Sequence, residues 1–219
     1  MPKKSKTSYF TTRGKNFGNL WAAYSLKADK VLLLGSDRQL AHWLLNLEFS
    51  PDVRSFAFQP GSKILVSTSP SSSQYNLDFH FEVLPVQGAT ELHFLRVNGY
   101  SANVAEKIDV ALRKKYIYKE FNDDDWAASK WKVFPLLRVS TFLCGGKNTY
   151  IPFGLVEEAN VHVNTHKYGS LKSYLSGVQN YDRNLCLLVF CRMYAEGKIQ
   201  VNFDRVFFAL DTQWWLNEN

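Results

Sequence analysis

The chain has 219 residues, of which 46% are hydrophobic and 15% aromatic, and its formal net charge is +6 at pH 7. This apolar content excludes a disordered chain and is enough for one large or two small domains. No apolar run reaches membrane-spanning length, and the basic charge is compatible with a polyanionic partner such as nucleic acid.

The cysteines Cys144, Cys186 and Cys191 form an odd set without metal-ligand spacing. An odd, unspaced set of this kind is typical of free thiols in a reducing compartment. We therefore expect a cytoplasmic protein with no membrane segment.

The N-terminal segment is basic and rich in aromatic residues. Residues 1–30 hold seven Lys or Arg side chains and a single acid, Asp29. We interpret residues 1–16 either as an arm that follows a phosphate backbone or as a solvated tail. In the first interpretation the residues that contact DNA are Lys3, Lys4, Lys6, Arg13 and Lys15.

A helix is predicted over Asp37–Phe49, with Ser36 as its N-cap and Gln39 three residues later. Strands are then predicted over Val53–Gln59, Lys63–Thr68, Leu77–Leu84 and Leu92–Val97.

A second helix is predicted over Ser101–Lys115, running into a short strand over Lys114–Phe121. The order of helix, strands, helix and strand predicts an α+β fold with a mixed sheet. The basic end of this helix adds three candidate DNA contacts, Arg113, Lys114 and Lys115.

The acidic segment Asn122–Asp125 is interpreted either as the boundary between a domain of residues 1–124 and a domain of residues 125–219, or as the cap of a helix around Trp126–Lys130. In the second domain a helix, a turn and a second helix precede an apolar hairpin, which is the order of a winged-helix module. The predicted elements are a strand over Val133–Leu143, an extended segment at His162 and His166, helices over Ser170–Val178 and Arg183–Glu196, and strands over Lys198–Phe203 and Val206–Leu210, linked by Asp204-Arg205.

The second helix of that pair is a poor reader of base edges, because residues 185–190 are almost wholly apolar. The polar side chains with which it could contact bases are those of Arg183, Asn184 and Arg192. The second interpretation of this module is a protein-docking element, and the Trp214-Trp215-Leu216 end suits either docking or capping of the module's own core.

Residues 36–60 and 76–98 resemble the TnsA-type endonuclease subunit of heteromeric transposons, a PD-(D/E)xK nuclease followed by a winged-helix-like domain. The resemblance rests on Ser36 with Gln39, on Leu47-Glu48-Phe49-Ser50-Pro51-Asp52-Val53, on Gln59-Pro60 and on Leu77-Asp78-Phe79. It implies a PD-(D/E)xK restriction-endonuclease-like mixed sheet with flanking helices. It also implies DNA, a DDE transposase and an ATPase regulator as partners.

The resemblance places the catalytic site at Asp78, with Gln39 in place of the family's helix glutamate. The family's Glu-x-Lys falls on Arg96-Val97-Asn98. One carboxylate beside amides and a guanidinium cannot hold Mg²⁺, which prefers carboxylate oxygens. We therefore expect a degenerate site without metal, in which Arg96 pairs with Asp78; Mg²⁺ would be a cofactor only if activity survives.

Three functions stay open. The first is a catalytically degenerate TnsA-like protein that binds DNA and partners in transposition or a related mobile-element or phage process. The second is an active metal-dependent endonuclease subunit with migrated ligands. The third is a structural or inhibitory protein that binds protein or itself rather than DNA. The migrated ligands of the second function would be drawn from Asp78, His80, Glu82, Glu91 and His93.

Overall fold

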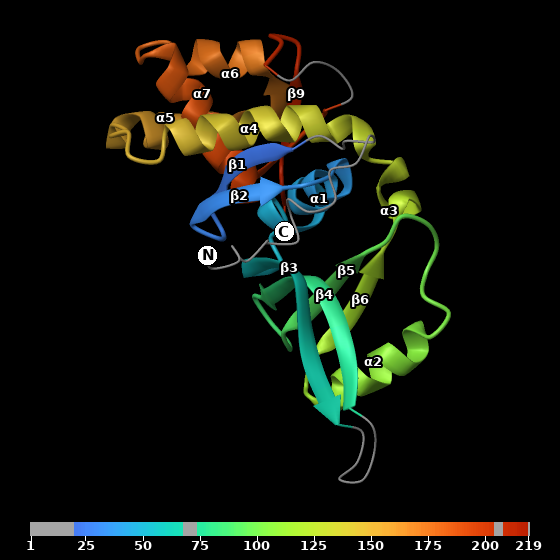
Figure 1. Ribbon diagram of the computed structural model, residues 1–219. Coiled ribbons are helices and arrows are strands. Elements are labelled where there is room, and N and C mark those ends of the chain that lie inside the picture. The colour runs from blue at the N-terminus through green and yellow to red at the C-terminus, as the bar shows by residue number, and fades with distance from the viewer. Residues whose placement is uncertain (1–19, 68–73, 204–207, 219) are drawn as a thin grey trace, which may run out of the picture. The chain divides into compact units, whose positions relative to one another are not determined.

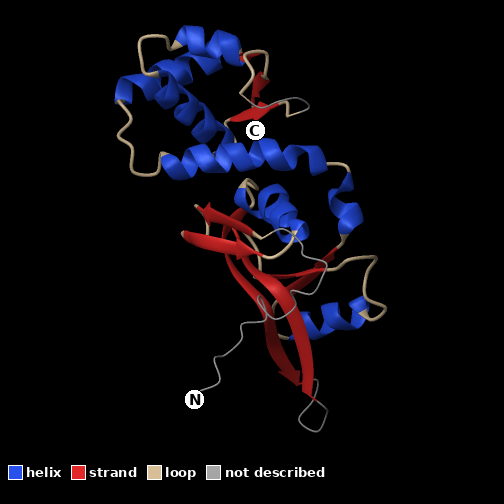
Figure 2. Cartoon of the chain, turned by 45° about the horizontal axis from the view of Figure 1, so that its top comes forward, coloured by secondary structure: helices blue, strands red, loops and turns tan. Residues whose placement is uncertain are grey.

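The computed structural model describes residues 20–67, 74–203 and 208–218 (Figure 1). The chain divides into two compact units, Met1–Lys130 and Trp131–Asn219. Strands dominate the first unit and helices the second (Figure 2). Both units combine helices with a sheet, so the α+β prediction is confirmed.

The first unit is built on a mixed four-stranded sheet in the order β3-β4-β5-β6. The pairs β3–β4 and β4–β5 are antiparallel, whereas β6 is parallel to β5, and helix α2 provides the crossover between those two strands. The elements are α1 (Asp37–His42), the π-helix η1 (Trp43–Glu48), β3 (Val53–Ser67), β4 (Gln74–Pro85), β5 (Glu91–Leu95), α2 (Val104–Arg113), β6 (Ile117–Phe121) and α3 (Asp123–Ala127).

The first predicted helix is confirmed as α1 followed by η1. Its N-cap Ser36 is extended and its hydroxyl accepts the Gln39 backbone N–H at 3.2 Å. The Gln39 side chain accepts the backbone N–H of Gly35 at 2.6 Å. The capping pair recognised in the sequence thus satisfies amides at the helix start.

The two strands predicted on either side of Pro60-Gly61 are one continuous strand, β3. The register against β4 shifts between Phe58 and Ser62, and Gly61 has a φ of 81°. The dipeptide therefore produces a bulge instead of a chain reversal, because proline and a positive-φ glycine suit a bulge as well as a turn.

Each face of this sheet has its own apolar cluster. On the α2 side, Leu77, Phe79 and Leu92 are buried with Ala111 and Tyr118. On the α1 side, the Phe81 ring lies against Phe56, Phe58 and His42, with centroid distances of 4.7 to 6.0 Å.

A two-stranded hairpin, β1 (Trp21–Ser25) and β2 (Lys30–Leu34), is tied to this unit by Glu48. The buried Glu48 carboxylate accepts hydrogen bonds from the Ser25 hydroxyl at 2.6 Å, the Leu26 N–H at 2.8 Å and the Trp43 indole at 3.0 Å. The glutamate of the LEFSPDV segment therefore has a structural role here.

The second unit holds four helices and a three-stranded antiparallel sheet in the order β7-β9-β8, counted over the described residues. Between the units lies the short 3-10 helix η2 (Lys130–Lys132). The elements are α4 (Val133–Gly145), α5 (Phe153–His166), β7 (Tyr168–Ser170), α6 (Leu171–Gly177), α7 (Arg183–Ala195), β8 (Ile199–Val201) and β9 (Gln213–Leu216).

Two segments of this unit were predicted as extended and are helical. Residues 133–143 belong to α4, and the segment with His162 and His166 belongs to α5. In α4 the buried residues follow a helical spacing, although Val, Phe and Thr favoured a strand. Those buried residues include Leu136, Val139 and Leu143.

The helix pair α6 and α7 confirms the predicted helix–turn–helix, and Gly197 after α7 has a φ of 73°. The final strand was misplaced: residues 208–210 are not a strand, and the partner of β8 is β9. The predicted link Asp204-Arg205 lies outside the described residues.

Within the described residues, no helix combines the length and apolar content needed to cross a membrane. 

Candidate functional site

The four residues of the predicted nuclease site do not form one cluster of mutual contacts among the described residues, and three of them have partners elsewhere. Asp78 on β4 forms an ion pair with Lys63 at 3.3 Å, and about half of each side chain is exposed. Arg96 follows the end of β5 and donates from Nη1 to the Ser101 hydroxyl at 2.8 Å, so it is not engaged with Asp78 as we predicted. Gln39 caps α1, and Asn98 is exposed in the loop before α2.

Glu91 and His93, which were weighed as migrated ligands, are joined on β5. His93 Nε2 lies 2.7 Å from Glu91 Oε2, and Lys119 Nζ on β6 lies 2.7 Å from Glu91 Oε1. Both oxygens of this carboxylate therefore accept a hydrogen bond from a nitrogen.

The pair continues into the protein through a residue that sequence reasoning missed. His42 Nε2 on α1 lies 3.0 Å from His93 Nδ1, and His42 Nδ1 lies 3.2 Å from the Asn46 side-chain nitrogen. His42 and His93 are buried, at 0% and 3% exposed. We refer to Asn46, His42, His93, Glu91 and Lys119 as the histidine relay. The only sequence signal for His42 was its place four residues before Asn46 on the same helix.

The hydrogen bonds of the relay fix one consistent arrangement of protons. A Glu91 carboxylate can only accept, so His93 Nε2 carries a proton and its Nδ1 accepts from His42 Nε2. His42 Nδ1 then accepts from Asn46. Both imidazoles are neutral in this arrangement and every ring nitrogen has a partner.

The electrostatics agree with neutral rings. Burial lowers the pKa of His42 well below its usual value, and the neighbouring His93 and His80 lower it further. Burial also lowers the pKa of His93, against the opposing effect of Glu91. The hydrogen bond from His93, together with Lys119, lowers the pKa of Glu91 to about 2.

Aromatic rings seal the inner end of the relay. The Phe121 ring lies 4.5 Å from His42 and 4.9 Å from His93, centroid to centroid, and Phe81 lies 5.1 Å from His42. The Trp126 ring centroid lies 6.0 Å from that of His42, and its buried indole nitrogen has no hydrogen-bond partner among the residues that the structure describes. The relay therefore opens to solvent through Lys119, whose side chain is 45% exposed.

His80, another candidate for a migrated metal ligand, contacts the backbone and an aromatic ring of β5. His80 Nδ1 accepts the backbone N–H of Leu95 at 3.1 Å, and its ring lies 4.7 Å from Phe94. Within residues 20–67, 74–203 and 208–218, no three His, Cys, Asp or Glu side chains are grouped so that they could hold a metal ion.

A second buried polar cluster lies on the α2 side of the sheet. The Glu120 carboxylate accepts from the Ser101 hydroxyl at 2.5 Å, from Lys107 at 2.9 Å and from the Tyr118 hydroxyl at 3.1 Å. Lys107 also donates to the Ser101 hydroxyl at 2.8 Å. Because the Glu120 side chain is fully buried, this cluster holds α2 and its preceding loop onto β6.

The candidate DNA contacts fall into two groups. Lys3, Lys4, Lys6, Arg13 and Lys15 lie outside the described residues. Arg113, Lys114 and Lys115 are all exposed where α2 ends, and Lys115 has a positive φ of 62°. A cationic patch at a helix C-terminus is favourable for the helix itself, so its presence alone does not select a nucleic-acid role.

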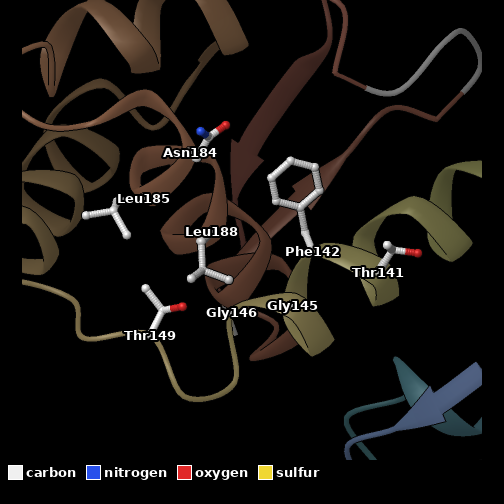
Figure 3. Close-up of a pocket in the computed structure, with 8 residues that line it drawn as sticks. All are labelled: Thr141, Phe142, Gly145, Gly146, Thr149, Asn184, Leu185 and Leu188. Atoms are coloured by element: carbon white, nitrogen blue, oxygen red, sulfur yellow. The ribbon is translucent and has the colours of Figure 1, made fainter.

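Helix α7 is largely buried, and part of its remaining surface lines an apolar pocket of about 340 Å³ (Figure 3). Leu185 and Leu188 from α7 and Phe142 and Thr141 from α4 line this pocket. Arg192 donates to the Gly146 carbonyl at 3.2 Å. Arg192, one of the polar residues of α7, is therefore engaged by the residue that follows α4.

A comparison with known protein families found no matching family model, and a comparison with curated proteins found no matching sequence.

Proposed function

We propose that the protein is a DNA-binding and partner-binding component of transposition or a related mobile-element process, similar to TnsA but without a competent nuclease site. The observation that carries this proposal is the order of the second unit: helix α5, strand β7, helices α6 and α7, then strands β8 and β9. With the sheet order β7-β9-β8, this is the arrangement expected of a winged-helix module.

The first unit supports the nuclease-like half of the proposal. Its mixed sheet carries Asp78 on β4 and a Glu-x-His sequence, Glu91 to His93, on the adjacent strand β5. A PD-(D/E)xK site needs an aspartate on one strand and a Glu-x-Lys on the next. When the motif is aligned with β5 instead of with residues 96–98, Glu91 takes the position of its glutamate. His93, with a neutral imidazole, then takes the position of its lysine.

The state of the carboxylates supports a binding role over hydrolysis. A catalytic Mg²⁺ is held by carboxylate oxygens that are free to face it. Glu91 is neutralised by Lys119 and hydrogen-bonded by His93, and Asp78 is paired with Lys63. To bind a metal ion, Glu91 would have to release Lys119 and Asp78 would have to release Lys63.

The distribution of charge indicates where DNA affinity resides. Residues 1–19 hold five Lys or Arg side chains and no acid, so they account for five of the six net positive charges. Non-specific DNA affinity comes from cations that displace counterions from phosphates. We therefore assign the main electrostatic contact to this segment, with Arg113, Lys114 and Lys115 as a second one.

A salt titration of duplex DNA binding tests the proposal. If the five N-terminal cations contact phosphates, deletion of residues 1–19 should reduce the magnitude of the slope of log affinity against log salt concentration by about 4 to 5. In a matched variant with Arg113, Lys114 and Lys115 changed to Gln, the magnitude of the same slope should decrease by about 3 at most. Full-length protein that binds no duplex at low salt would exclude the proposal and favour a protein-only module.

A second function, an endonuclease with migrated ligands, is favoured by one observation, the contact of Glu91 with His93 and of His93 with His42. If this relay supports catalysis, supercoiled plasmid should be nicked with Mg²⁺ or Mn²⁺. Nicking should then disappear in Glu91→Gln and persist in the exposed control Glu106→Gln.

A further inference from the structure

The outer face of the small sheet in the second unit carries two aromatic side chains in register. Tyr168 on β7 is opposite Trp215 on β9, and Trp215 is opposite Gln200 on β8. Opposed residues on neighbouring strands project to the same face. Tyr168 is 76% exposed and Trp215 is 40% exposed, whereas Trp214, the residue before Trp215 on β9, is buried.

The Trp215 ring is held in place although it is exposed. Its Nε1 donates to Gln200 Oε1 at 2.9 Å, and Gln200 Nε2 donates to Asn217 Oδ1 at 3.1 Å. Asn217 in turn donates to the Gly197 carbonyl at 2.9 Å. A side chain fixed in this way loses little conformational freedom when a ligand stacks on it.

Two lysines flank this face, and each is paired with an exposed glutamate. The exposed strand residues Gln200 and Gln213 are uncharged amides, and Lys167 and Lys198 stand directly beside the strands. Lys167 pairs with Glu218 at 3.2 Å and Lys198 with Glu196 at 2.9 Å. All four side chains are more than half exposed, so these ion pairs are weak and phosphates can compete for the lysines.

We propose that this face binds single-stranded nucleic acid, with unpaired bases stacked on Tyr168 and Trp215 and the backbone beside Lys167 and Lys198. The proposal rests on the proposed function and names the nucleic acid that one surface takes. Exposed aromatic rings flanked by cations suit unpaired bases, whose faces are free, whereas the bases of a duplex are already stacked. The flanking lysines favour this ligand over an apolar peptide.

The test measures fluorescence anisotropy of a short fluorescein-labelled oligothymidylate and of a labelled duplex with the full-length chain. Tyr168→Ala and Trp215→Ala should each weaken oligothymidylate binding about tenfold, because stacking supplies that much affinity per base. Trp215→Phe should keep most of the affinity, and duplex affinity should not change. The control Phe153→Ala removes an equally exposed aromatic from the start of α5 and should change neither affinity.

The outcomes separate this proposal from the proposed function. Wild-type protein that binds neither probe would contradict the proposed function. Wild-type protein that binds both, with the same oligothymidylate affinity in Tyr168→Ala, would overturn the stacking face alone. Thermal melting checks each variant, and if Trp215→Ala fails to fold, Tyr168→Ala decides the question.

Discussion

His42 Nε2 lies 3.0 Å from His93 Nδ1, so a helix and a strand separated by 51 residues share one buried hydrogen bond between neutral rings. This contact joins α1 to β5 on the α1 side of the sheet, and Glu91 and Lys119 continue it to a solvent-facing ion pair.

The histidine relay should make stability depend on pH. His42 and His93 have lowered pKa values in the folded state, so below pH 6.5 the unfolded chain binds more protons. Stability is then complete above about pH 6.5 and decreases as the pH falls, by up to about 1.4 kcal/mol per pH unit for each ring. Melting temperatures measured between about pH 7.5 and about pH 5 give the slope.

The matched variant for this test is His42→Gln with His93→Gln. It should melt lower at neutral pH but show a shallower slope. A residual slope is expected, because burial also lowers the pKa of His80 and of His162. Equal slopes for wild type and variant would exclude the relay as the source of the pH dependence.

Glu91 should contribute far more to stability than its partner Lys119. Glu91→Gln keeps the size of the side chain but removes the charge that His93 and Lys119 face, at a cost of about 1–3 kcal/mol. Lys119→Met should cost under about 1 kcal/mol, because that side chain is nearly half exposed. Urea unfolding at pH 7 gives both changes in the free energy of unfolding. Equal losses would contradict the conclusion that Glu91 is the more buried and the more stabilising partner of this ion pair.

The same carboxylate has a separate acid dependence. The pKa of Glu91 is lowered to about 2, so its contribution is present above pH 4.5 and is lost as the pH falls from 4.5 towards 2. Wild type and Glu91→Gln should therefore converge in stability over that acid window. A constant difference between them down to pH 2 would show that the carboxylate is not the ionised group.

Glu48 should be essential for attachment of the β1–β2 hairpin. Glu48→Ala leaves the Ser25 hydroxyl, the Leu26 N–H and the Trp43 indole without their shared acceptor, at a cost of about 3 kcal/mol. Hydrogen exchange of the Leu26 amide should accelerate more than exchange in β4. The exposed Glu106→Ala is the control, and unchanged protection at Leu26 would refute the role.

Gly177 should not tolerate a side chain, because a Cβ there would lie 2.1 Å from His162 Nδ1. Gly177→Ala is expected to cost about 1–3 kcal/mol. Gly145→Ala, at the end of α4 with no atom within 4 Å of the new Cβ, should be neutral or stabilising. The double variant Gly177→Ala with His162→Ala should recover part of the loss, and strict additivity would argue against this contact.

Elements with local signals were predictable from the sequence. Ser36 with Gln39 marked the start of α1, and Gly197 marked the end of α7. Helix α4 was missed because its β-branched and aromatic residues favour strands, and only tertiary burial of Leu136, Val139 and Leu143 resolves the period.

The candidate site was predictable only in part. Glu91 and His93 alternate along one strand, so their shared face follows from strand geometry. His42 comes from another element, and its approach to His93 depends on how α1 packs across the sheet, which no local pattern encodes. The Trp214-Trp215 end was ambiguous for the same reason; strand alternation buries the first ring and exposes the second.

The measurement that tests the central claim most directly is one agarose gel of supercoiled plasmid incubated with the full-length chain and Mg²⁺ or Mn²⁺. The account predicts plasmid that is retarded before protein removal and still supercoiled after it, because the sheet binds no catalytic metal while the basic segments bind DNA. Open-circular or linear plasmid after protein removal, lost in Asp78→Ala or Glu91→Gln, would contradict it.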